Sequence, residues 1–127
     1  MGKMIPLSVP NFEGNEIVYV KKAVEQGWVS TAGAYIVELE KKMAEYLHMP
    51  SAVACQSGTA AIHLAMMECG IGSKDGVIVP TLTFIAAVNP VSYLCAQPIF
   101  MDCDESLCMD PIKLESFCRS ECFLEDG

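Results

Sequence analysis

Three short apolar runs, separated by helical segments, constrain the fold of this chain most strongly. The runs cover residues 51–55, 77–79 and 98–102, and the segments 60–69 and 84–93 between them have the composition of helices. Strands joined by crossover helices lie parallel in one sheet, and continuous apolar character is typical of strands buried on both faces. The sequence therefore predicts an α/β fold, a mostly parallel sheet with flanking helices.

The first fifty residues differ in character from the rest. Residues 1–14 contain two prolines and are expected to form an extended arm. Apolar positions recur at helical spacing over 15–27 and again over 35–48, so two helices are predicted there. We therefore expect two regions, an arm with two helices over 1–50 and an α/β region over 51–127.

The net charge argues against two classes of partner. The chain has 16 acidic and 8 basic residues and a net charge of −8, without a basic cluster. A nucleic-acid-binding protein or a protein that lies on an anionic membrane needs a basic face. Pro80, Asn89 and Pro90 also interrupt the longest apolar stretch, which stays short of the roughly 20 residues that a membrane span requires. We expect neither nucleic acid nor membrane as a partner.

The seven cysteines suggest a reducing compartment. Their number is odd, no two form a C-x-x-C pair, and the two histidines, His48 and His63, have no cysteine at zinc-ligand spacing. No secretory leader pattern opens the chain. We expect free thiols in the cytoplasm and no metal site.

A compact polar motif follows the first apolar run. Ser57, Gly58 and Thr59 stand between that run and a helix. The unpaired N–H groups at a helix start attract anions, glycine allows close approach, and the two hydroxyls add donors, which together favour a phosphate site. The alternative is a plain helix N-cap with a turn glycine.

His63 and the group of aspartates near the end of the chain each have a structural and a functional interpretation. His63 sits in an apolar helix, where a structural histidine is the more common finding than a catalytic one. Asp102, Asp104 and Asp110 precede a last, acidic helix predicted over 111–122. These carboxylates could hold Mg²⁺, but solvated loop charges are the simpler interpretation.

Taken in order, the segments resemble the DegT/StrS group of fold-type-I aminotransferases that depend on pyridoxal phosphate (PLP) and act on keto-sugars attached to nucleotides. The resemblance covers nearly the whole chain. The matching pieces are Ile5-Pro6, Asn15-Glu16, the loop 27–33, the helix 35–47, the segment 57–65, the segment 79–86 and the segment 98–104. The resemblance implies the N-terminal part of the large PLP-binding domain, which is incomplete here.

The same resemblance implies roles for particular residues. Ser57, Gly58 and Thr59 would bind the phosphate of PLP, and Phe84 would stack on its ring; the alternative for Phe84 is a core residue. The loop that carries Trp28, Ser30 and Thr31 would lie near the sugar. It looks most like the branch that makes 4-amino sugars of the legionaminic or bacillosamine kind. The alternative is a loop that packs on its own domain.

The residues that would complete the chemistry are not expected in this chain. Aminotransfer needs a lysine that holds the cofactor as a Schiff base and a carboxylate beside the pyridine nitrogen. In the family both come after position 127, and none of the seven lysines here stands at the family's position: 3, 21, 22, 41, 42, 74 and 113. We expect no catalytic residue here, an ending at Gly127 that is a break inside the domain, and no activity of this chain alone.

Three functions remain open. The first is a parent aminotransferase that works as a homodimer and moves an amino group from glutamate to a 4-keto nucleotide sugar. The second is a sugar dehydratase of the same family, which has a histidine in place of the lysine. The third is a truncated piece that folds or oligomerises without turnover.

Overall fold

The computed structural model describes residues 4–27 and 33–123, and the chain divides into two compact units, Met1–Ala54 and Cys55–Gly127. Each unit is described by itself. Within the described residues, no helix has the length and apolar character that crossing a membrane would require.

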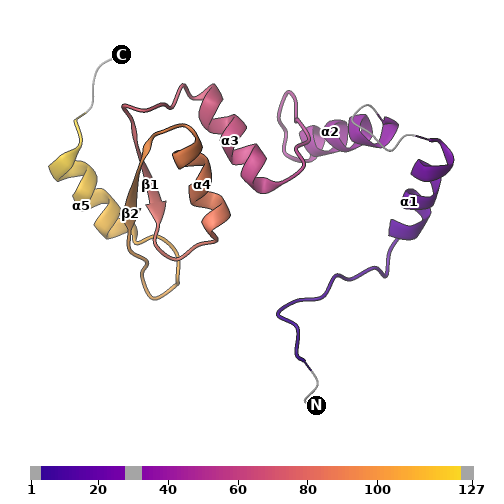
Figure 1. Ribbon diagram of the computed structural model, residues 1–127, viewed down its shortest axis with the longest axis horizontal. Helices are drawn as coiled ribbons and strands as arrows, with labels where there is room; N and C mark the ends of the chain where they lie inside the picture. Colours follow the sequence, from indigo (N-terminus) through magenta and orange to yellow (C-terminus); the bar gives the residue numbers. More distant parts are fainter. Residues whose placement is uncertain (1–3, 28–32, 124–127) are drawn as a thin grey trace. The chain divides into compact units, whose positions relative to one another are not determined.

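The first unit contains the two predicted helices, α1 (Glu16–Glu25) and α2 (Ala34–Tyr46) (Figure 1). The rings of Tyr19 and Tyr35 meet edge to face, with centroids 5.5 Å apart. No residue of either helix is buried, and the ion pairs along the helices join exposed side chains four residues apart. Such exposed pairs stabilise a helix by only about 0.3–0.5 kcal/mol each.

The second unit is built on two parallel strands, β1 (Gly76–Pro80) and β2 (Gln97–Met101). Ile78 lies opposite Ile99 in the register of the pair. Helix α4 (Ile85–Tyr93) makes the crossover between the strands (Figure 1). The predicted strand–helix–strand order and the parallel pairing are confirmed.

The core lies where α4 packs against the sheet. The buried residues at its centre are Val79 from β1, Val88 and Val91 from α4, and Ala96 just before β2. Val91 is fully buried, and so is its neighbour Pro90. Because proline has no N–H group, Pro90 removes one hydrogen bond from α4, and burial of its ring in the core offsets part of that loss.

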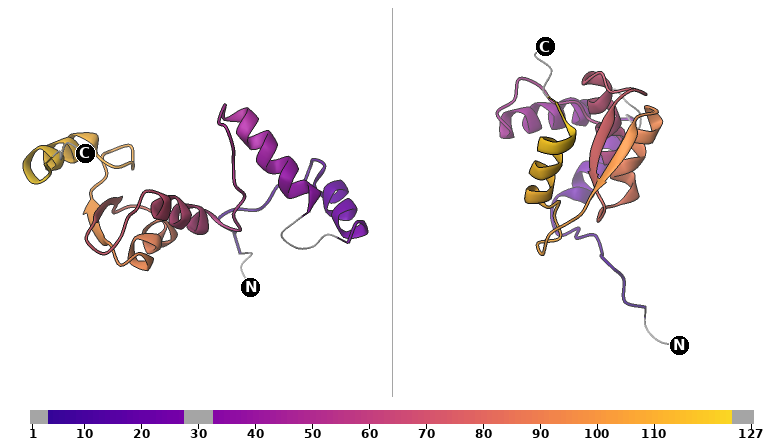
Figure 2. Two further views of the ribbon diagram at one scale, coloured as in Figure 1. Left: turned by 90° about the horizontal axis from the view of Figure 1, so that it is seen from above. Right: turned by 90° about the vertical axis from the view of Figure 1, so that its left-hand side faces the viewer.

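Two more helices flank the strands. Helix α3 (Gly58–Glu68) packs beside α4, and the rings of His63 and Tyr93 meet edge to face with centroids 5.5 Å apart. Helix α5 (Pro111–Glu121) lies on the other side of the strand pair from α4, as both the first view and the further views show (Figures 1 and 2). The sheet therefore has helices on both sides, as the apolar character of its strands predicts.

The prediction of a strand over 51–55 is wrong. Among the described residues β1 and β2 pair only with each other, so this segment has no neighbouring strand to satisfy its backbone groups. The backbone N–H of Ala54 donates instead to the Glu40 carboxylate at 2.9 Å, and Val53 remains exposed. Apolar composition favours a strand, but only a paired neighbour makes one.

Candidate functional site

The start of α3 presents unpaired backbone donors. Ser57 is the N-cap: its hydroxyl accepts from the N–H of Ala60 at 3.2 Å, and its carbonyl accepts from Ala61 at 3.1 Å. Within the described part of the chain, the N–H groups of Gly58 and Thr59 donate to no acceptor. The partial positive charge at the end of the helix adds to these two donors, so the site attracts an anion.

The N-cap and the phosphate contact, which the sequence gives as alternatives for Ser57, are compatible. The cap uses a lone pair of the hydroxyl oxygen, and the hydroxyl hydrogen stays available to a second acceptor. Ser57 and Gly58 are exposed and Thr59 is half-buried, so a ligand can reach all three.

Gly58 leaves room above the start of the helix. A Cβ built at this position would meet nothing within 4 Å. The fold therefore does not need glycine here to avoid a clash. The open space would instead let a ligand approach the two free N–H groups closely. Two N–H donors, two hydroxyls and a helix start are a donor set that fits a phosphate group.

Phe84 stands at the start of α4. It is the N-cap residue, with extended backbone, and its side chain is 81% exposed. The alternative in which Phe84 is a core residue of this unit is therefore wrong. Its ring borders a shallow hollow with Leu82 and Thr83, beyond the C-terminal end of β1.

The topology brings the starts of α3 and α4 to the same end of the sheet. Helix α4 begins just after β1 ends, and α3 leads through a turn at residues 69–75 into the beginning of β1 (Figure 1). The start of α3 therefore points toward the C-terminal end of β1, as the start of α4 does. Ligands of open α/β sheets bind at this end of the strands.

The remaining candidates fall into three groups. Trp28, Ser30 and Thr31 lie outside the described residues. His63 is half-buried and its ring packs against Tyr93, which agrees with a structural histidine. The four lysines 21, 41, 42 and 113 each pair with a carboxylate at the surface.

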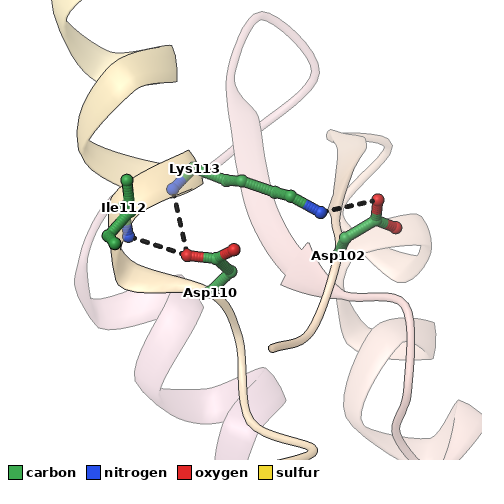
Figure 3. Close-up of polar contacts among 4 residues, drawn as sticks. All are labelled: Asp102, Asp110, Ile112 and Lys113. Carbon is green, nitrogen blue, oxygen red and sulfur yellow. Dashed lines mark hydrogen bonds and ion pairs between the residues drawn. The ribbon is translucent and has the colours of Figure 1, made fainter. Parts of the chain in front are cut away.

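The acidic residues after β2 build the start of α5 (Figure 3). One carboxylate oxygen of Asp110 accepts from the N–H groups of Ile112 at 2.9 Å and Lys113 at 3.2 Å. The Lys113 ammonium pairs with Asp102 at 3.3 Å. This helix cap was not predicted from the sequence, although an aspartate directly before Pro111 is a known signal for a helix start.

The Asp104 carboxylate stabilises a turn through hydrogen bonds with Ser106. The hydroxyl and the N–H of Ser106 both donate to its carboxylate, and these bonds lower the pKa of Asp104. Among the residues with described positions, no three His, Cys, Asp or Glu side chains gather in an arrangement that could hold a metal ion. The acidic stretch is accounted for by local structure.

Comparison with known proteins places the chain in one family. Residues 10–121 match the DegT/DnrJ/EryC1/StrS aminotransferase family. GDP-perosamine synthase of Caulobacter vibrioides is 43% identical over 113 residues, which are 88% of this chain and 30% of that protein. GDP-perosamine synthase of Escherichia coli O157:H7 is 45% identical over 80% of this chain and 28% of that protein.

Solved structures share the fold. The sugar aminotransferase Spr1654 of Streptococcus pneumoniae, in its PLP form, is 33% identical with a TM-score of 0.78, over 88% of this chain and 29% of that one. A GDP-4-keto-6-deoxymannose-3-dehydratase, at 22% identity and a TM-score of 0.75, shares the fold alone. The chain spans less than a third of the length of these relatives. Its sequence and its fold together show that the chain belongs to the DegT/DnrJ/EryC1/StrS aminotransferase family.

Proposed function

We propose that this chain is the N-terminal part of an enzyme that uses PLP to transfer an amino group from glutamate to a 4-keto nucleotide sugar. The observation that carries the proposal is the start of α3, where the free N–H groups of Gly58 and Thr59 form an anion site in a chain of this family. In this proposal the second unit supplies the first part of the PLP-binding domain, and the first unit supplies the arm and two helices.

The residues of the described chain would bind and orient the cofactor. The N–H groups of Gly58 and Thr59 and the hydroxyls of Ser57 and Thr59 would donate to the phosphate. Phe84, whose ring is exposed, would pack on the face of the pyridine ring. When bound, PLP serves as the electron sink through which an amino group moves between donor and acceptor. The lysine and the carboxylate that complete this chemistry would come from outside these 127 residues.

The substrate class rests on the relatives. Both relatives with more than 40% identity described above are named for the synthesis of GDP-perosamine, which is a nucleotide-linked compound. These names support a nucleotide sugar as the substrate, and the loop with Trp28, Ser30 and Thr31 would contact it. The finer expectation of the legionaminic or bacillosamine branch receives no support from these relatives.

We also propose that the enzyme is a homodimer. In the second unit Phe84, Phe100 and Ile112 are at least 60% exposed. The outer edges of the two strands have no partner among the described residues. Exposed apolar side chains and open strand edges favour association with further protein, either the rest of the enzyme or a second subunit.

A hybrid enzyme tests the proposed function. In it, residues 1–121 of this chain replace the matching N-terminal part of GDP-perosamine synthase from Caulobacter vibrioides. With PLP, glutamate and a 4-keto nucleotide sugar, the hybrid should form the amino sugar, while the 127-residue chain alone should form none.

Two results would contradict the proposal. A folded hybrid that fails to bind PLP would contradict the role proposed for the start of α3, because the lysine and the carboxylate of the hybrid come from the synthase. Turnover by the 127-residue chain above the rate of free PLP would show that the catalytic lysine is already present.

A further inference from the structure

The described part of the N-terminal arm, residues 4–12, has apolar side chains that nothing in its own unit covers. Ile5, Leu7 and Val9 are 90%, 100% and 72% exposed. The arm precedes α1 without forming a helix or a strand, and within the described residues the N–H groups of these three donate to no acceptor (Figure 1). The arm therefore offers both apolar side chains and backbone donors to a partner.

The two prolines of the arm stand on one edge of the extended chain. In a strand, successive residues direct their N–H and C=O groups to opposite edges and their side chains to opposite faces. Residues 6, 8 and 10 therefore share one edge, on which Pro6 and Pro10 have no N–H to donate. Residues 5, 7 and 9 share the other edge, where each has both groups. An arm with this pattern pairs along one edge only, as edge strands that contain proline do.

The prolines also hold most of the arm near the conformation of a strand. Each fixes its own φ at about −65° and restricts the residue before it to extended backbone. Ile5, Pro6, Val9 and Pro10 are thus held extended before any pairing, and the bend that the structure has at Leu7 falls between them. Only a short central part has to straighten, which lowers the entropy cost of pairing.

The pattern of the arm is complementary to itself. When two arms run antiparallel with Leu7 opposite Leu7 of a second copy, Ile5 lies opposite Val9. These pairs occupy the positions at which two residues exchange both N–H···O bonds, and the prolines fall at the non-bonded positions between them. Residues 4–12 also contain none of the charged residues, so two chains of net charge −8 can meet here with little repulsion.

We propose that the arm is a dimerisation strand, which pairs antiparallel with the arm of a second copy around a two-fold axis at Leu7. The inference rests on the homodimer proposed above and identifies a surface at which the two copies meet. A two-fold axis requires a surface that matches itself, which this pattern provides. The side chains of Ile5, Leu7 and Val9 from both copies lie on one face of the pair, where opposite side chains contact each other across the strands.

Proline substitutions at two neighbouring residues test which edge pairs. Leu7→Pro removes the central N–H, and because of the two-fold symmetry the pair loses two hydrogen bonds. Ser8→Pro removes an N–H from the edge that faces away from the second copy. Both side chains are exposed, so neither variant should disturb the folding of the chain.

The measurement is sedimentation of the 127-residue chain over a range of concentrations. Leu7→Pro should raise the dissociation constant of the dimer roughly tenfold or more. Ser8→Pro should leave this constant unchanged or lower it, because the new proline restricts Leu7 to extended backbone. A chain that stays monomeric, or an equal effect of the two variants, would overturn the proposal.

Amide exchange separates strand pairing from a plain apolar contact, because only pairing protects alternate residues. In NMR spectra of the dimer, the N–H groups of Ile5, Leu7 and Val9 should exchange slowly and that of Ser8 quickly. This protection should disappear on dilution to the monomer, and protection that persists there would also refute the arm pair. Product formation by the hybrid enzyme tests the proposed reaction separately, so the two proposals can fail independently.

Discussion

Replacing Gly58 by alanine separates the binding role of the α3 start from its structural role. A Cβ at this position meets nothing within 4 Å, so the methyl group causes no clash inside the chain. Glycine in a helix is about 0.5–1 kcal/mol less favourable than alanine, so the variant should fold at least as well as the original. In thermal melts of the 127-residue chain, the midpoint should stay the same or rise by a few degrees.

The effect on ligand binding should have the opposite sign. The methyl group would stand in the space through which a phosphate approaches the N–H groups of Gly58 and Thr59. Loss of one hydrogen bond to a charged group costs about 1.5–3 kcal/mol, which corresponds to a roughly 10- to 150-fold higher dissociation constant. The measurement is a PLP titration of the hybrid enzyme defined above, followed by the absorbance of the bound cofactor.

Gly72→Ala is the matched control for this prediction. Its Cβ also meets nothing within 4 Å, and it lies in the turn that precedes β1, away from the start of α3. PLP affinity should be unchanged in this variant. If Gly58→Ala and Gly72→Ala bind PLP equally well, the phosphate does not sit on the start of α3. A lower melting midpoint for Gly58→Ala would contradict the structural part of the reasoning.

Three further predictions concern the second unit. Val91→Ala removes two fully buried methyl groups and should lower the free energy of unfolding by about 2–3 kcal/mol in urea titrations, whereas Ile112→Ala, at a side chain 78% exposed, should change it by no more than about 0.5 kcal/mol. Asp110→Ala removes the cap of α5 and should cost about 1 kcal/mol, detected as faster amide exchange confined to α5; uniform exchange rates would refute this. Ser106→Ala should raise the pKa of Asp104 in an NMR titration, because the hydroxyl bond that lowers it is lost. Since the pKa of Asp104 is lower in the folded chain than in the unfolded one, its contribution to folding stability is present above the unfolded pKa and disappears as the pH falls through the folded pKa. An Asp104 titration that is unchanged in Ser106→Ala would contradict this prediction.

The sequence by itself determined the elements with strong local signals. The helices over 16–25 and 34–46 follow from apolar residues at helical spacing, and the helix over 58–68 was predicted over 60–69 from its composition. The parallel pair β1–β2 follows from the strand–helix–strand order. The cap at Ser57 was also within reach, because a serine before a helix start satisfies a backbone donor one turn on. These features depend on neighbours in sequence, which the sequence shows directly.

The tertiary structure decided what depends on distant partners. Residues 51–55 have the apolar composition of a buried strand, yet they form none, because no other strand pairs with them among the described residues. Phe84 looks like a core residue from its type, and its exposure follows from its place at the start of α4, beyond the sheet. Asp102 and Lys113 stand eleven residues apart and pair only because α5 returns to the end of β2. Strand pairing, burial and long-range ion pairs are properties of two segments together, so neither segment determines them alone.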